Sequence, residues 1–337
     1  MKKSDAHTAL QAINRRRVLR SLMAAAATPL FTGPVGAQGA YPGKPIRLIV
    51  PSAAGGAPDA ICRLLAIELG TALGQPIIVD NKPGAGGAIG MSELARATPD
   101  GYTLGYGNVV TLSINKSLYT KLPYDPDSLI GIALMGTVQN ALVVRNDLPV
   151  KTVAELIAYA KKNPGKLTMA SAGNGTTGHL GGEWFKSLTG TFITHVPYRG
   201  SPMAIQDLIG GQVDLMFDNL SSIGPHIKSG RVRALGVSGK TRSPLFAQLP
   251  TVAEAGVAGY ETTAWGGIVG PKGLPELLVT KLNSEINRIL AAPAVREKYA
   301  QMAFETMASP PSLLMTMARL ESPRWAEIIK RSGAKVE

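Results

Sequence analysis

Residues 46–59, IRLIVPSAAGGAPD, join a short β-branched run to a turn of small residues and then to a proline and an acid. The run at 46–50 predicts a strand. Pro58 suits the first turn of a helix, and Ile61 and Leu65 follow it at helical spacing. A strand that passes through a glycine-rich turn into a helix is typical of α/β proteins.

The same alternation continues along the chain, with an apolar run at 141–144 starting a second series. It predicts βαβ units, two α/β domains and a mainly parallel sheet. Further strands are expected at 76–80, 102–106, 167–170, 193–196, 213–217, 234–237 and 264–269. Helices are expected at 89–97, 153–162, 203–209, 277–290, 295–302 and 313–329, and around Leu180, Trp184 and Leu188.

Residues 167–178, LTMASAGNGTTG, repeat the strand, small-residue turn and helix start in the second series. Unpaired N–H groups and the helix dipole attract anions to such a point. Ser171, Thr176 and Thr177 add hydroxyl donors. Either loop alone is equally consistent with a turn that needs glycine only for its geometry. Two loops, one in each half of the chain, predict a clamp for a small anion.

Several polar side chains near these loops have two interpretations. Asp59 and His179 each lie in the first turn of an expected helix, where capping or packing is the alternative to ligand binding. If Asp59 faces the cleft, it binds an amino group or a water on the solute. Arg199 either pairs with a carboxylate or is solvated. Asp218 and Asn219 follow a strand, where crevice residues lie, with a simple turn as the alternative.

Residues 1–37 are predicted to be a signal peptide. A basic stretch at 14–20 precedes a short apolar run at 22–31 and small residues at 35–37. The paired arginines favour the twin-arginine route, with general secretory export as the alternative. The apolar run is too short to span a bilayer. We therefore expect export to the periplasm and a mature chain that begins near Gln38, after cleavage near Ala37.

Charge and cysteine content narrow the function further. The leader contributes a net +5 of the formal +12, which leaves about +7 on the mature chain. Scattered cations and scarce aromatics argue against a nucleic-acid partner, and the positive charge favours anionic solutes. Cys62 is the only cysteine, so no intramolecular disulfide is possible.

Catalytic signatures are weak. Residues 84–90, GAGGAIG, imitate a dinucleotide-binding turn, but the next strand ends in Gly107-Asn108 without the acid that holds a ribose. An exported NAD(P)-dependent oxidoreductase is thus a minor alternative. The chain has no Gly-x-Ser-x-Gly elbow, and His179, His195 and His226 show no metal-ligand spacing. We predict a protein that is not an enzyme and has neither cofactor nor metal.

A series of short motifs follows in order along the chain after the leader. They are YPxxPI at 41–46, PSAAGGAPD at 51–59, NKPGAGG at 81–87, PDGY at 99–102, LPYD at 122–125, SAGNGT at 171–176, VPYRG at 196–200, GQVDLMFDN at 211–219, LPTVAEAG at 249–256 and SGAKV at 332–336. As a set they resemble the Bug-type extracytoplasmic receptors, the solute-binding components of tripartite tricarboxylate transporters.

The resemblance implies a type II periplasmic binding protein fold, with two α/β domains joined by two crossing strands and a ligand cleft between them. Domain 1 would comprise residues 38–141 and 260–337, and domain 2 residues 142–259. Such a protein captures a small organic anion, here a carboxylate, and delivers it to membrane transporter subunits. A ligand-loaded partner of a membrane sensor kinase is the alternative. We expect a monomer.

The resemblance and the two loops together predict the residues that bind the solute. They are Ser52, Ala53, Ala54, Gly55, Gly56, Ala57, Asp59, Asn108, Ser171, Ala172, Gly173, Asn174, Gly175, Thr176, His179, Tyr198 and Asp218. The chain departs from the family at Ser52, where an aromatic is common, and Pro58 comes one position later than usual. The pocket is therefore expected to be roomier or more polar at this loop.

Overall fold

The computed structural model describes residues 41–334, so the predicted signal peptide lies outside the described residues. Strands form in the order β2-β1-β3-β9-β4-β7-β5-β6, with β10 and β8 also paired to β4. Their bounds are β1 Ile46–Val50, β2 Ile77–Asn81, β3 Thr103–Asn108, β4 Ile130–Val144, β5 Thr168–Ser171, β6 Thr194–Pro197, β7 Leu215–Asn219, β8 Arg233–Val237, β9 Thr263–Gly270 and β10 Phe304–Thr306.

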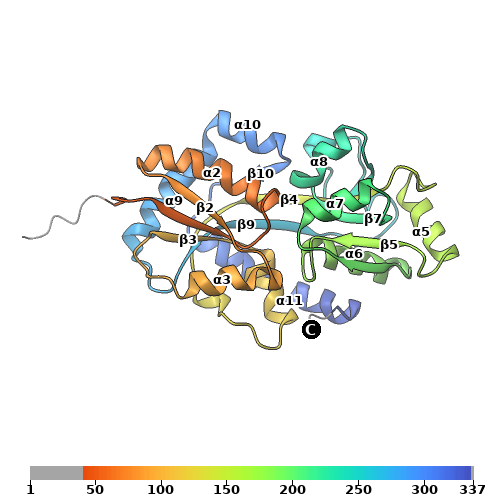
Figure 1. Ribbon diagram of the computed structural model, residues 1–337, viewed down its shortest axis with the longest axis horizontal. Helices are drawn as coiled ribbons and strands as arrows, with labels where there is room; N and C mark the ends of the chain where they lie inside the picture. Colours follow the sequence, from red (N-terminus) through yellow and green to blue (C-terminus); the bar gives the residue numbers. More distant parts are fainter. Residues whose placement is uncertain (1–40, 335–337) are drawn as a thin grey trace, which may run out of the picture. The chain divides into compact units, whose positions relative to one another are not determined.

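The long strand β4 belongs to two sheets. Its residues 130–139 pair with β9, and its residues 140–144 pair with β7 and β8. Figure 1 shows β4 and β9 between the strands of the first lobe, drawn in orange, and those of the second lobe, drawn in green. The chain therefore forms two α/β lobes that share β4, as the two-domain binding fold requires.

The expectation of a mainly parallel sheet is correct only for the outer strands. β1 pairs in parallel with β2 and β3, and β5 pairs in parallel with β6 and β7. β4 and β9 are antiparallel to every strand they contact. Within each lobe, helical crossovers return the chain in the same direction and give parallel pairs. β4 carries the chain into the second lobe and β9 carries it back, so these two strands run in opposite directions.

Helices cover the sheets of both lobes. They are α2 Ala57–Leu73, α3 Ala88–Ala95, α4 Asn115–Leu118, α5 Val153–Lys162, α6 Thr177–Thr189, α7 Ser201–Ile209, α8 Leu220–Lys228, α9 Glu276–Ala291, α10 Pro293–Gln301 and α11 Ser312–Ser332. Shorter turns lie at 85–87, 126–128 and 244–246, and a π-helix spans Val110–Ile114. The sequence did not predict the π-helix, α4, α8 or β10.

Local capping explains why some helix bounds were predictable. The hydroxyl of Thr152 accepts a hydrogen bond from the Glu155 amide, and the Glu155 carboxylate accepts one from the Lys151 amide. This reciprocal arrangement satisfies amides that the first turn leaves unpaired. This capping fixes the start of α5 at Val153, and the observed range, Val153–Lys162, is the predicted one.

Ser238 ties together the two chain segments that cross between the lobes. Its hydroxyl accepts from the Asn140 amide at 2.9 Å and donates to the Thr262 carbonyl at 2.6 Å. Its own amide and carbonyl bond the same two residues. Because Ser238 is fully buried, water does not compete for these bonds, and the crossing point is a fixed reference for both lobes.

The final helix contacts both lobes. The Ser113 hydroxyl donates to the Ala318 carbonyl in α11, and near the end of α11 the Arg331 guanidinium lies 5.6 Å from the Trp184 ring of α6. A second property concerns all the described helices. Within residues 41–334, no helix is both long enough and apolar enough to cross a membrane.

Candidate functional site

A cavity of about 720 Å³ opens between the two lobes. This volume lies within the range typical of small-molecule sites. The first lobe lines it with residues 51–53, 56, 58, 61, 83–87, 106, 108–111 and 119, and the second with residues 172–174, 176–178, 197–201, 218 and 219. Val138, Ala264 and Trp265, from β4 and β9, complete the wall.

The loop between β1 and α2, residues 51–56, ends at a helix start without a side-chain cap. Gly55 adopts φ +80°, and its amide donates to the Asp59 carboxylate at 2.9 Å. Arg63 Nε lies 3.0 Å from the same carboxylate. Burial opposes ionisation of Asp59, but the hydrogen bonds from Arg63 and Gly55 outweigh it and hold the pKa of Asp59 below its ordinary value. Asp59 thus holds the loop in place from outside the cavity lining. Pro58 has no amide, and the Gly55 and Gly56 amides already bond Asp59 and the Ala53 carbonyl, so the start of α2 favours an anion through its helix dipole.

The loop between β5 and α6, residues 171–176, is held in a similar way. Gly175 adopts φ +79°, and its amide donates to Nδ1 of His179 at 3.0 Å. The Thr176 hydroxyl caps α6 by accepting from the His179 amide and also donates to the Gly173 carbonyl. The Ser171 hydroxyl lies 2.7 Å from Nε2 of His195. The hydroxyls expected to bind solute at Ser171 and Thr176 are therefore already hydrogen-bonded to other protein groups.

The two lobes approach one another at the loops. A methyl group added at Gly200 would lie 2.8 Å from Cβ of Ala53, and one added at Gly175 would lie 2.4 Å from Leu118. Both contacts join residues of different lobes. Glycine at these positions permits the lobes to come this close.

Among residues 41–334, two charged side chains line the cavity, and they differ in environment. Asp218 is 5% exposed, and Oδ1 accepts a 2.7 Å hydrogen bond from the Ser201 hydroxyl. Burial is the main cause that raises the pKa of Asp218 to about 7. Arg199 is exposed at the rim.

The structure brings most of the predicted site residues together at this cavity. Those that line it are Ser52, Ala53, Gly56, Asn108, Ala172, Gly173, Asn174, Thr176, Tyr198 and Asp218. The predicted residues outside the lining are Ala54, Gly55, Ala57, Asp59, Ser171, Gly175 and His179. Asp59 and His179 instead hold the two loops, which agrees with the capping alternative considered for each.

Other lining residues were not among those predicted from the sequence. Residues 83–87, which imitate a dinucleotide-binding turn, form part of the cavity wall, as do Tyr106, Tyr119 and Trp265. The glycine content of 83–87 was the available signal, because such a loop lets a ligand approach the backbone. The aromatic residues gave none: Tyr106 and Trp265 reach the wall through the pairing of β3 with β9, and Tyr119 through the position of α4.

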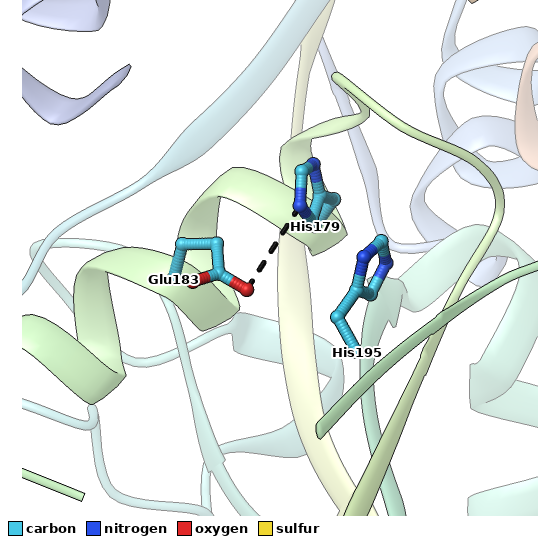
Figure 2. Close-up of side chains that lie close together, drawn as sticks. All are labelled: His179, Glu183 and His195. Atoms are coloured by element: carbon cyan, nitrogen blue, oxygen red, sulfur yellow. Dashed lines mark ion pairs between the residues drawn. The ribbon is translucent and has the colours of Figure 1, made fainter. Parts of the chain in front are cut away.

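The histidines that seemed unrelated in sequence lie together. His179 and His195 stack with ring centroids 4.0 Å apart, and His179 Nε2 lies 3.9 Å from Glu183 (Figure 2). Burial is the main cause that lowers their pKa values, to about 3 for His179 and about 4 for His195. Both rings are therefore neutral near pH 7.

His179, Glu183 and His195 lie close together, but they are not arranged to bind a metal ion. Nδ1 of His179 accepts from the Gly175 amide, which places the ring proton on Nε2, the nitrogen that faces Glu183. A protonated nitrogen has no lone pair for a metal. Lys186 Nζ also lies 2.6 Å from the Glu183 carboxylate and competes with any cation there. The cluster instead supports the loop at 171–176.

Comparisons with known proteins agree with this architecture. Residues 61–334 match the family described as tripartite tricarboxylate transporter family receptor. BugT from Bordetella pertussis is 35% identical over 327 residues, covering 96% of this chain and 100% of BugT. The structure of R. palustris Rpa4515 with adipate is 36% identical, with a TM-score of 0.86, over 88% of this chain and 100% of that one.

MatC (Rpa3494) from Rhodopseudomonas palustris with bound malate is 32% identical, with a TM-score of 0.81, over 86% of this chain and 100% of that one. The resemblance to Bug-type receptors and the periplasmic binding protein fold are thereby confirmed. The chain belongs to the tripartite tricarboxylate transporter receptor family.

Proposed function

We propose that this protein captures a small organic carboxylate in the cavity between its lobes and delivers it to the membrane subunits of a tripartite tricarboxylate-type transporter. The observation that carries the proposal is the cavity itself, with the start of α2 on one side and the start of α6 on the other. The dipoles of both helices favour a carboxylate between them, and the first turn of α6 brings Thr177 and Gly178 to the cavity wall. Two similar structures hold adipate and malate.

The same proposal includes export, domain limits and assembly. Residues 1–37 act as a signal peptide, of the twin-arginine type, and the mature monomer works in the periplasm. Domain 1 comprises residues 38–141 and 260–337, and domain 2 residues 142–259. The change of partner sheet within β4 and the Ser238 bonds to Asn140 and Thr262 support these limits. Binding without chemical conversion is the expected activity.

Thermal unfolding of the chain from Gln38 onward tests the binding. The protein is heated with each member of a panel of mono- and dicarboxylates, amino acids, aromatic acids and NAD(P). A ligand at 100 times its dissociation constant adds about 2.7 kcal/mol to stability. Stabilisation by carboxylates supports the proposal, and stabilisation by a dinucleotide alone would contradict it.

Two glycines that flank α2 provide a matched pair of variants. Gly55 precedes the helix at the cavity with φ +80°, and Gly74 ends it with φ +68°. Alanine at either position strains the backbone by about 1 kcal/mol. We expect Gly55→Ala to weaken carboxylate binding at least fivefold, because it displaces the loop, and Gly74→Ala to leave affinity unchanged. Equal affinity in both variants would show that the loop at 51–56 does not hold the solute.

A further inference from the structure

The Asp218 carboxylate has one satisfied oxygen and one unsatisfied oxygen. Oδ1 accepts from Ser201. The Asn219 amide is close enough to the carboxyl to lower its pKa, but Oδ2 is buried and accepts no well-aligned hydrogen bond. Asp218 lines the cavity at the end of β7. A buried acceptor without a donor is unfavourable, so this oxygen needs a partner that the described chain does not supply.

Other acidic side chains with little exposure are paired with a cation. Asp59 pairs with Arg63, and Asp214, at 15% side-chain exposure, pairs with Arg145 at 2.8 Å. Among the described residues, no salt bridge involves Asp218. The two paired acids lie outside the cavity lining, and the unpaired one lies in it. The missing partner is therefore expected to come from the solute.

Two further unpaired polar atoms in the cavity wall complement Asp218. The Trp265 side chain is 1% exposed, and its Nε1 has no acceptor. The Ser52 hydroxyl, from the loop at 51–56, is also unpaired. The indole N–H requires an acceptor and Asp218 Oδ2 requires a donor. A solute that satisfies both carries acceptor oxygens and, separately, a hydrogen-bond donor.

We propose that Asp218 makes this receptor selective for carboxylates that also carry a hydroxyl or ammonium group. The inference rests on the proposed function, because the solute's carboxylate is taken to lie at the helix starts. The donor group meets Oδ2 of Asp218. An otherwise identical solute without the donor leaves this oxygen unsatisfied. A second carboxylate in place of the donor meets an acidic side chain with no cation beside it.

Binding to matched pairs of solutes tests the selectivity. Calorimetric titration at pH 8 compares malate with succinate, aspartate with succinate, and 4-hydroxybenzoate with benzoate, using the wild-type chain from Gln38 onward. We expect the member with the donor to bind about tenfold tighter or more in at least one pair, since the unsatisfied oxygen disfavours the other member. Equal affinities within every pair, or preference for the member without the donor, would overturn the inference.

Asp218→Asn supplies the second measurement. The amide keeps the shape and can still accept from Ser201, but it offers N–H groups where Oδ2 stood. We expect the variant to bind the two solutes of the selective pair with about equal affinity, or to bind the solute without the donor more tightly. Asp127→Asn, which removes an exposed acid paired with Lys116, is the matched control for charge and should retain it. Undiminished selectivity in a folded Asp218→Asn variant would overturn the assignment.

Failure of this inference is distinct from failure of the proposed function. If carboxylates bind but their donors make no difference, the receptor function stands and the role of Asp218 is wrong. If no carboxylate binds, both are wrong. The wild-type ranking needs no variant, so the test remains decisive even if Asp218→Asn does not fold.

Discussion

The two loops at the cavity are held by the same hydrogen-bond pattern, but the side chains that accept the bonds differ in chemistry. In each, a glycine near φ +80° donates its amide to the side chain four residues later, from Gly55 to Asp59 and from Gly175 to His179. The first acceptor is a carboxylate that pairs with Arg63, and the second is a neutral imidazole stacked on His195. One loop therefore depends on charge, and the other on packing and a neutral ring.

Because of this difference, we expect the two loops to respond differently to salt and to pH. A charged pair with one exposed partner is screened by salt and survives down to the low pKa of its carboxylate. A buried neutral histidine is insensitive to salt but resists protonation, so the stability of the loop that it holds falls at low pH. Substitutions, pH and salt should separate the two loops even though their hydrogen-bond patterns match.

The largest effect is expected at Gly175. Alanine there would be strained at φ +79° and would place its methyl group 2.4 Å from Leu118, whereas at Gly55 the nearest atom is Pro202 Cγ at 3.5 Å. Left-handed strain costs about 1 kcal/mol, and overpacking adds about 2 kcal/mol. We expect urea unfolding to show a loss of about 3 kcal/mol for Gly175→Ala and about 1 kcal/mol for Gly55→Ala.

Leu118→Ala provides the control for the steric part. The double variant should lose less than the sum of the two single changes, because the added methyl group then has room. Additive losses, or equal losses at the two glycines, would show that the contact between the lobes does not restrain Gly175.

The sequence was sufficient to predict the two loops because their signals are local. A β-branched run, small residues and a helix start are adjacent in the chain at 46–59 and again at 167–178. The same holds for α5, where Thr152 and Glu155 mark the start of the helix. Such features depend on neighbours within a few residues, which a single sequence displays.

The remaining features depend on contacts between distant segments. His179 meets His195 only because β5 and β6 pair in parallel and place both beside the same loop. Trp265 reaches the cavity because β9 pairs with β3 and β4. The π-helix at Val110–Ile114 has no periodic pattern to reveal it, and Asn108 stabilises its start by accepting from two backbone amides. Neither composition nor spacing encodes such placements.

The second effect is acid sensitivity of the histidine-held loop. An ordinary histidine has a pKa of 6.5, and burial first lowers that of folded His179 to about 3. Between these values the unfolded chain binds a proton that the folded chain refuses, so stability falls as pH drops below 6.5. Asp218 acts in the opposite sense, because its raised pKa, about 7, favours the folded state at low pH.

His179→Asn isolates the histidine contribution, since an amide oxygen can accept from Gly175 and does not titrate. From pH 7.5 to pH 5, urea unfolding should show a loss that is smaller in the variant than in the wild type by about 2 kcal/mol. Above pH 7.5 the histidine is neutral in both the folded and the unfolded chain, so the stability gap between the two proteins should no longer change with pH. Parallel pH profiles for the two proteins would contradict a neutral buried His179.

The smallest loss of stability is expected for a substitution at Asp59, and its dependence on salt tests the role of charge in the loop at 51–56. Asp59→Asn can keep the bond from the Gly55 amide but loses the ion pair with Arg63, whose side chain is 52% exposed. Because solvent screens such a pair, we expect a loss of about 1 kcal/mol or less at low salt. At 0.5 M NaCl the difference from wild type should shrink, whereas the loss caused by His179→Asn at pH 7.5 should stay the same. If salt reduced both losses equally, or left the Asp59→Asn loss unchanged, the contrast between a charged and a neutral loop support would be wrong.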